Sequence, residues 1–102
     1  MTRDALRAVV LEELARLAPE ATLSTLPPGA RLREELDIDS FDFLRLVTAL
    51  DERLAINVPE RDYAALQTLG GCLDYLAQRL DEAEVQRAAE GAGTGRAPEV
   101  QG

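Results

Sequence analysis

The sequence predicts an all-α protein: a small antiparallel four-helix bundle, with three longer helices, one short helix and a long first loop. Three stretches of the chain repeat apolar residues at spacings of three and four, the period of an amphipathic helix. A length of 102 residues allows one small domain. We expect residues 1–80 to form this domain, and residues 81–102 to form a helix extension followed by a disordered tail.

The first helix is expected over residues 2–18. Thr2 is a suitable N-cap, and Pro19 ends the helix because proline cannot continue it. The buried stripe is expected to consist of Leu6, Val10, Leu14 and Leu17, with Glu12, Glu13 and Arg16 facing solvent.

Residues 19–38 have no sustained period and contain Pro27-Pro28-Gly29, a strong turn signal. A connection of this length in a compact domain is usually either functional or held down along its course. Four leucines are expected to hold it across the bundle: Leu23, Leu26, Leu32 and Leu36.

The second helix is expected to begin at Ser40 and to run to Leu54. Asp39 is a good N-cap, and Asp42 stands three residues later, which approximates a capping box. Ser40 therefore falls on the first helical position, exposed at the tip of the helix. The expected buried stripe is Phe43, Leu44, Val47, Leu50 and Leu54.

A short third helix is expected over residues 60–66, with Pro59 at its first position. Thr68 can cap the last helix, in which Gly70 and Gly71 weaken the first turn by about 1 kcal/mol each, or less near the end. Its buried positions are expected to be Leu69, Cys72, Leu73, Leu76 and Leu80, Cys72 being a small core residue and not a reactive thiol. Residues 81–90 can prolong this helix, and a disordered tail is expected from Gly91.

The charge of the chain is −8 and is concentrated around the second helix, since residues 34–62 hold nine acids and three arginines. Such a patch attracts an oppositely charged partner and disfavours nucleic acid. No apolar run reaches the length of about 18 residues that a membrane span requires. One cysteine excludes an intramolecular disulfide and fits a reducing compartment, so we expect a cytoplasmic monomer.

A serine displayed in this way is a nucleophile, a modification site or only a helix cap. Nucleophilic catalysis needs a base, usually histidine, and the chain has none. A calcium loop starting at Asp37 would need glycine at its sixth position and glutamate at its twelfth, where the chain has Asp42 and Thr48. We therefore expect no catalytic residue and no metal site.

Asp39-Ser40-Phe41 and the helix after it resemble the Asp-Ser-Leu site of acyl carrier proteins. The similarity continues through Ala55-Ile56-Asn57-Val58-Pro59-Glu60, Leu66-Gln67-Thr68-Leu69 and Leu73-Asp74-Tyr75-Leu76, and covers about residues 2–80. It implies a non-catalytic carrier that holds acyl intermediates as thioesters on 4'-phosphopantetheine. A phosphopantetheinyl transferase would attach this arm from coenzyme A to Ser40, with Asp39 as N-cap and recognition residue.

The resemblance also implies a docking face and an acyl pocket. Its other partners would be acyl-activating, synthase or acyltransferase enzymes with basic docking surfaces. The docking residues would be Asp37, Phe41, Asp42, Arg45, Thr48, Asp51 and Glu52. The acyl chain would lie among Phe43, Val47, Leu50, Leu66, Leu69 and Leu76, residues that the helical pattern also assigns to an ordinary core.

Three positions depart from the family pattern: Phe41 replaces leucine or methionine, Arg45 replaces glutamate, and Thr48 replaces methionine. Arg45 reverses a charge on the expected docking face, which favours a specialised carrier for a lipid, a secondary metabolite or an unusual acyl group. Two alternatives remain open from the sequence. One is a peptidyl or aminoacyl carrier, although the acids before Ser40 favour the acyl type, and the other is an unmodified helical adaptor protein.

Overall fold

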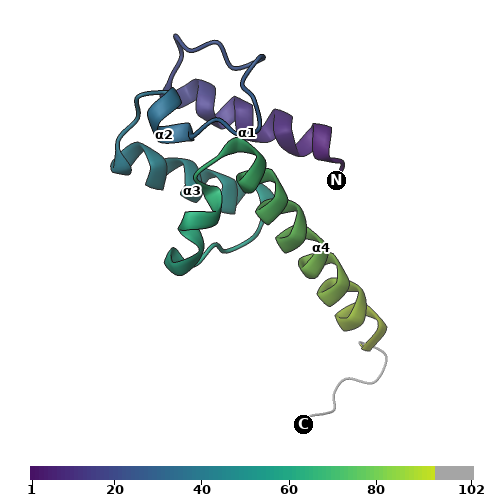
Figure 1. Ribbon diagram of the computed structural model, residues 1–102. Helices are drawn as coiled ribbons and strands as arrows, with labels where there is room; N and C mark the ends of the chain where they lie inside the picture. Colours follow the sequence, from purple (N-terminus) through teal and green to yellow (C-terminus); the bar gives the residue numbers. More distant parts are fainter. Residues whose placement is uncertain (94–102) are drawn as a thin grey trace.

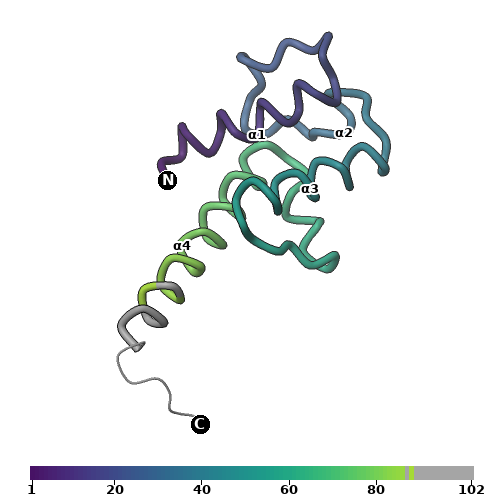
Figure 2. Tube along the Cα trace, turned by 180° about the vertical axis from the view of Figure 1, so that it is seen from behind, coloured from purple at the N-terminus to yellow at the C-terminus, as the bar shows by residue number. Residues whose placement is uncertain are grey.

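The computed structural model describes residues 1–93 and confirms the predicted all-α bundle. Its elements in chain order are α1 (Arg3–Leu17), α2 (Leu32–Glu35), α3 (Ser40–Leu54), η1 (Glu60–Leu66) and α4 (Leu69–Gly93). α1 and α3 lie side by side and run in opposite directions, with α4 beside them (Figures 1 and 2). Among the described residues, the one element that the sequence did not predict is α2, a single turn inside the long first loop.

The predicted caps of α1 and α4 are confirmed. The Thr2 hydroxyl accepts a hydrogen bond from the Ala5 N–H at 3.1 Å, and the Thr68 hydroxyl accepts one from the Gly71 N–H at 3.0 Å. The short helix also has its predicted bounds, but Pro59 is its N-cap and not its first residue, and the helix is of the 3-10 type. α1, η1 and α4 therefore start where the sequence has a local polar or proline signal.

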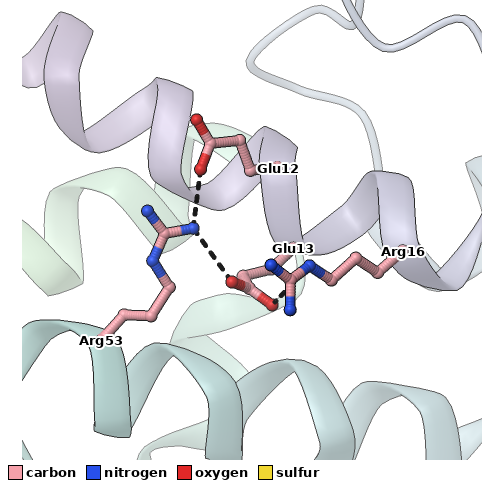
Figure 3. Close-up of polar contacts among 4 residues, drawn as sticks. All are labelled: Glu12, Glu13, Arg16 and Arg53. Carbon is pink, nitrogen blue, oxygen red and sulfur yellow. Dashed lines mark hydrogen bonds and ion pairs between the residues drawn. The ribbon is translucent and has the colours of Figure 1, made fainter.

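Glu13 was expected to face solvent, and this prediction is wrong. Its side chain is only 6% exposed and lies between α1 and α3, 3.0 Å from Arg53 and 4.0 Å from Arg16 (Figure 3). Arg53 also binds Glu12 at 2.8 Å. Seven residues after Leu6, position 13 falls on the buried face of the helix. The carboxylate is tolerated there because Arg53 supplies its counter-charge.

The long first loop is held down by its leucines as predicted, and also by backbone hydrogen bonds. Leu26 and Leu32 are buried, and Leu23 and Leu36 are partly buried. The loop is joined to the start of α4 by three backbone bonds: Leu32 N–H to Gln67 O at 2.8 Å, Leu69 N–H to Ala30 O at 3.1 Å, and Gly70 N–H to Pro28 O at 2.7 Å.

This close approach explains the two glycines at the start of α4. A Cβ atom on Gly70 would lie 3.1 Å from Pro28 O, and one on Gly71 would lie 2.7 Å from Ala65 O. Gly71 in particular has no room for a side chain. Glycine destabilises the first turn of α4, but it allows α4 to approach η1 and the loop closely.

The core is built from leucine and valine side chains of all the helices. Leu6, Val10 and Leu14 of α1 are buried as predicted, whereas Leu17 is only partly buried. Cys72 is fully buried, which confirms its assignment to the core. η1 is held to α4 by the Tyr75 hydroxyl, which donates to Asp62 at 2.6 Å, and to α3 by an edge-on contact of Phe43 with Tyr63.

α4 continues well past the bundle. It reaches Gly93, three residues beyond the predicted limit at residue 90, and residues 94–102 of the predicted tail lie outside the described residues. Figures 1 and 2 both show its second half extending away from the other helices. Val85, on this part of the helix, is 69% exposed.

Candidate functional site

Ser40 lies where the sequence predicts, at the first position of α3 and exposed to solvent. The carboxylate of Asp39 accepts a hydrogen bond from the Asp42 N–H at 2.8 Å, and the Asp39 carbonyl accepts one from the Phe43 N–H at 3.0 Å. These contacts confirm Asp39 as the N-cap. The serine hydroxyl is thus presented at the positive end of a helix with a well-defined start.

The segment before Ser40 is a tight corner that the sequence did not reveal. α2 ends with the Ile38 N–H donating to the Arg33 carbonyl at 3.1 Å, and Asp37 has a left-handed φ of 54°. This arrangement is a Schellman-type helix end with aspartate in the place where glycine is commonest. Because Ile38 is buried beneath it, the corner fixes the direction in which the chain enters α3.

The exposed face of α3 next to Ser40 differs from the expected one at Leu44. The sequence placed Leu44 in the buried stripe, but it is 43% exposed, and Leu46 is buried instead. Each helical residue advances by about 100°, so Leu44 lies further from the centre of the stripe than Leu46 does. Phe41, the next apolar residue on this face, is 75% exposed.

Three of the predicted docking residues, Arg45, Thr48 and Glu52, are exposed along the same face. Asp51 is placed differently, since it is partly buried and its carboxylate lies near the Val58 backbone. Burial raises the pKa of its carboxyl, while a hydrogen bond from the Val58 backbone and the charge of Arg79 act in the opposite direction. We define the α3 face as Phe41, Leu44, Arg45, Thr48 and Glu52.

The six side chains expected around an acyl chain are all in the core and at most 4% exposed: Phe43, Val47, Leu50, Leu66, Leu69 and Leu76. They come from α3, η1 and α4, and belong to one continuous cluster. An acyl chain among them would therefore have to displace packed side chains.

The chemistry available at Ser40 is that of an acceptor for modification. The chain has no histidine, and its described residues contain no group of three or more side chains that could hold a metal ion. No helix in the described part of the chain is long and apolar enough to cross a membrane. An exposed hydroxyl on a capped helix start, open to an approaching enzyme, fits the covalent attachment of a phosphopantetheine group.

Comparison with known proteins agrees with this class of site. Residues 4–76 match the family model described as a phosphopantetheine attachment site. The fold and the match together define a phosphopantetheine-dependent carrier.

Individual relatives identify the kind of phosphopantetheine-dependent carrier. An acyl carrier protein of Helicobacter hepaticus is 32% identical over 75 residues, covering 74% of this chain and 92% of the relative. The meromycolate extension acyl carrier protein of Mycolicibacterium aurum is 28% identical over 82 residues, covering 80% and 79%. Its counterpart from Mycobacterium leprae is 30% identical over 83 residues, covering 81% and 67%.

The chain therefore belongs to the acyl carrier protein family. Its prosthetic group is 4'-phosphopantetheine, on which acyl intermediates are carried as thioesters. Proteins of this family are generally non-catalytic, and they depend on a phosphopantetheinyl transferase and on synthases that act on the carried group.

Proposed function

We propose that Ser40 is the residue to which the phosphopantetheine arm is attached, with Asp39 as part of the surface that the transferase recognises. The supporting observation is the position of Ser40, exposed on the first turn of α3 and inside the matched residues 4–76. The arm's thiol would carry the acyl group, and the chain itself would catalyse no reaction. We place this carrier in the cytoplasm, as a monomer.

The attachment is tested by intact-protein mass spectrometry after incubation with coenzyme A and a broad-specificity phosphopantetheinyl transferase. Ser24 is the other serine of the chain, which makes Ser24→Ala the matched control for Ser40→Ala. The wild type and Ser24→Ala should each gain one phosphopantetheine, and a folded Ser40→Ala protein should gain none. Equal modification of both variants would refute the assignment.

The α3 face is the surface that we propose for docking of partner enzymes. Phe41 and Leu44 supply exposed apolar area beside Ser40, and Asp37 and Asp42 add negative charge at the same end. Apolar contact surrounded by charge is typical of protein interfaces. The expected partners are acyl-activating, synthase or acyltransferase enzymes whose docking surfaces carry basic groups. Asp51 contributes only its charge, because its carboxylate is partly buried near the Val58 backbone.

Arg45 makes the α3 face less acidic, and for this reason we propose a specialised pathway. Two of the relatives described above are named for meromycolate extension, which supports the extension of an unusual lipid chain. Arg45→Glu should improve acylation by general fatty-acid enzymes, with Arg61→Glu on η1 as the control for the same charge change elsewhere. Rapid elongation of the wild type by those enzymes, with no effect of Arg45→Glu, would contradict the proposal.

For the carried acyl chain, we propose the six-residue part of the core formed by Phe43, Val47, Leu50, Leu66, Leu69 and Leu76. These side chains are apolar and come from α3, η1 and α4, and none of them takes part in the α1–α3 ion pairs of Arg53. An acyl chain that enters here should move their methyl and ring resonances in an NMR spectrum. Changes confined to the surface would argue against burial of the chain.

A further inference from the structure

Two grooves meet at the corner of the chain before Ser40, and Asp37 and Ile38 line both of them. The first groove is lined by Arg31, Arg33, Glu34, Asp37, Ile38 and Gln67. We call it the arginine groove. The second lies between the end of α1 and residues 35–38 and contains the carboxylates of Glu20, Glu35, Asp37 and Asp42. No basic residue lines the second groove, which we call the acidic groove.

Both grooves are within reach of a group attached to Ser40. Ile38 precedes Ser40 by two residues, so the two Cα atoms are at most about 7 Å apart. A phosphopantetheine arm is a flexible chain with a phosphodiester, two amides and a terminal thiol. Its phosphodiester end must therefore lie close to the corner, and the rest of the arm can follow either groove.

The charge of the arm distinguishes the two grooves. A phosphodiester is an anion, which the four carboxylates of the second groove repel. The arginine groove also has two carboxylates, Glu34 and Asp37, but its two guanidinium groups balance their charge and can bind a phosphate directly. Arg31 already pairs with Glu34 at 3.2 Å. Within the part of the chain that the structure describes, no ion pair involves Arg33. Its guanidinium group is therefore the better partner for the phosphate.

We propose that the phosphopantetheine arm rests in the arginine groove, with its phosphodiester against Arg33 and its amide groups towards Gln67. The proposal rests on the attachment of the arm to Ser40, and it adds a binding site for the arm on the carrier itself. Arg33 and Gln67 are positioning residues in this account.

Gln67 is suited to this role because it is fixed in place on two sides. The side-chain nitrogen of Gln67 donates to the Tyr63 backbone carbonyl at 3.1 Å, and the backbone carbonyl of Gln67 accepts the Leu32 N–H at 2.8 Å. The remaining carboxamide oxygen is an acceptor for an amide N–H of the arm. A held residue loses little conformational freedom when it binds, so the groove is organised before the arm enters.

The resting position must also be easy to leave, because partner enzymes need the thiol. Ion pairs exposed to solvent are weak and are screened by salt. The contact between Arg33 and the phosphate is thus sufficient to bias where the arm lies and insufficient to retain it. The same position leaves the acidic groove and the α3 face uncovered for a basic partner.

The test uses the full chain labelled with carbon-13 and nitrogen-15, modified with unlabelled coenzyme A. Isotope-filtered NMR then detects contacts between arm protons and protein protons, and phosphorus-31 NMR reports on the phosphodiester. We expect contacts from the arm to Ile38 methyl groups and to the Gln67 side-chain amide. Arg33→Gln should weaken these contacts several-fold and shift the phosphorus resonance, whereas Arg61→Gln, at an exposed arginine on η1, should leave both unchanged.

Three results would overturn the proposal. Contacts from the arm to Leu17 or Leu36 would place it in the acidic groove. Arm signals as sharp as those of free pantetheine, without contacts to the protein, would show that no groove holds it. If the mass increase were found on a residue other than Ser40, attachment at Ser40 itself would be refuted. That result would therefore count against the proposed function, whereas the first two results count only against the position of the arm.

Discussion

Asp39 combines two properties at the start of α3, a hydrogen-bond acceptor and a negative charge. Its carboxylate caps the helix through the Asp42 N–H, and loss of an N-cap costs about 1 kcal/mol. Asp39→Ala should therefore lower the free energy of unfolding by about 1 kcal/mol, as measured by urea denaturation.

Asp39→Asn separates the two properties, because asparagine caps a helix almost as well as aspartate but carries no charge. We expect its stability to be close to that of the wild type, while modification by the transferase slows. An Asn variant as unstable as the Ala variant would show that the charge, and not the cap, supports the helix.

Cys72 should not react with thiol reagents in the folded protein. Burial raises the pKa of its thiol to about 12, so almost none of the reactive thiolate forms at neutral pH. The thiol of the attached arm, by contrast, has to be accessible to partner enzymes. Alkylation of the modified protein should label one thiol under native conditions and two after unfolding. Rapid labelling of Cys72 in the folded, unmodified chain would contradict this.

The same pKa shift predicts how stability depends on alkaline pH. Between the ordinary thiol pKa of 9.0 and about 12, the unfolded chain releases the Cys72 proton and the folded chain keeps it. The folded state then binds more protons, so stability falls as pH rises. Tyr75, whose pKa burial also raises to about 12, acts in the same direction. Cys72→Ala should therefore reduce this slope without removing it.

The end of α3 has a left-handed backbone conformation that is unfavourable for alanine. Ala55 has a left-handed φ of 55°, and the Ile56 N–H donates to the Asp51 carbonyl at 3.0 Å. Glycine adopts this conformation without strain. Ala55→Gly should stabilise the protein by about 1 kcal/mol, because a left-handed residue other than glycine costs roughly that amount.

Ala49→Gly is the matched control inside the same helix. Here glycine should destabilise by about 1 kcal/mol, because the backbone is helical and needs no left-handed residue. Thermal or urea unfolding of both variants checks the opposite signs. Destabilisation by Ala55→Gly would show that the conformation at this helix end is not under strain.

The helices show what the sequence could and could not predict. Caps and proline signals are local, so Thr2, Asp39 and Thr68 mark the helix starts correctly. Burial depends on partners that a pattern does not contain. The helical period puts position 13 on the buried face of α1, but only the presence of Arg53 on α3 explains how a glutamate is accommodated there.

At the site, too, local features could be predicted from the sequence and features that depend on folding could not. Ser40 and its cap follow from a few adjacent residues, whereas the corner at Asp37 and the arginine groove depend on chain segments brought together by folding. Gln67 is 27 residues from Ser40 in the sequence, and it reaches the groove because the loop is bonded to the start of α4. The proximity of Gln67 to Ser40 can therefore be recognised only from the structure.

At the scale of the whole molecule, the bundle should not need the outer half of α4. Beyond Leu80 the described side chains are exposed except for Ala83, which is partly buried. A chain that ends at Gln86 should unfold with a free energy within about 0.5 kcal/mol of the full chain, the usual limit for changes away from packed regions. A larger loss in urea denaturation would mean that residues after Gln86 stabilise the domain.

Attachment of the arm to Ser40 can be measured on a single tryptic peptide. Trypsin cuts after Arg33 and Arg45, and the resulting peptide, residues 34–45, contains Ser40 as its single hydroxyl side chain. Tandem mass spectrometry of the modified protein should find one phosphopantetheine on this peptide and none on the peptide that contains Ser24. An unmodified 34–45 peptide from a protein that has gained the mass elsewhere would contradict the account.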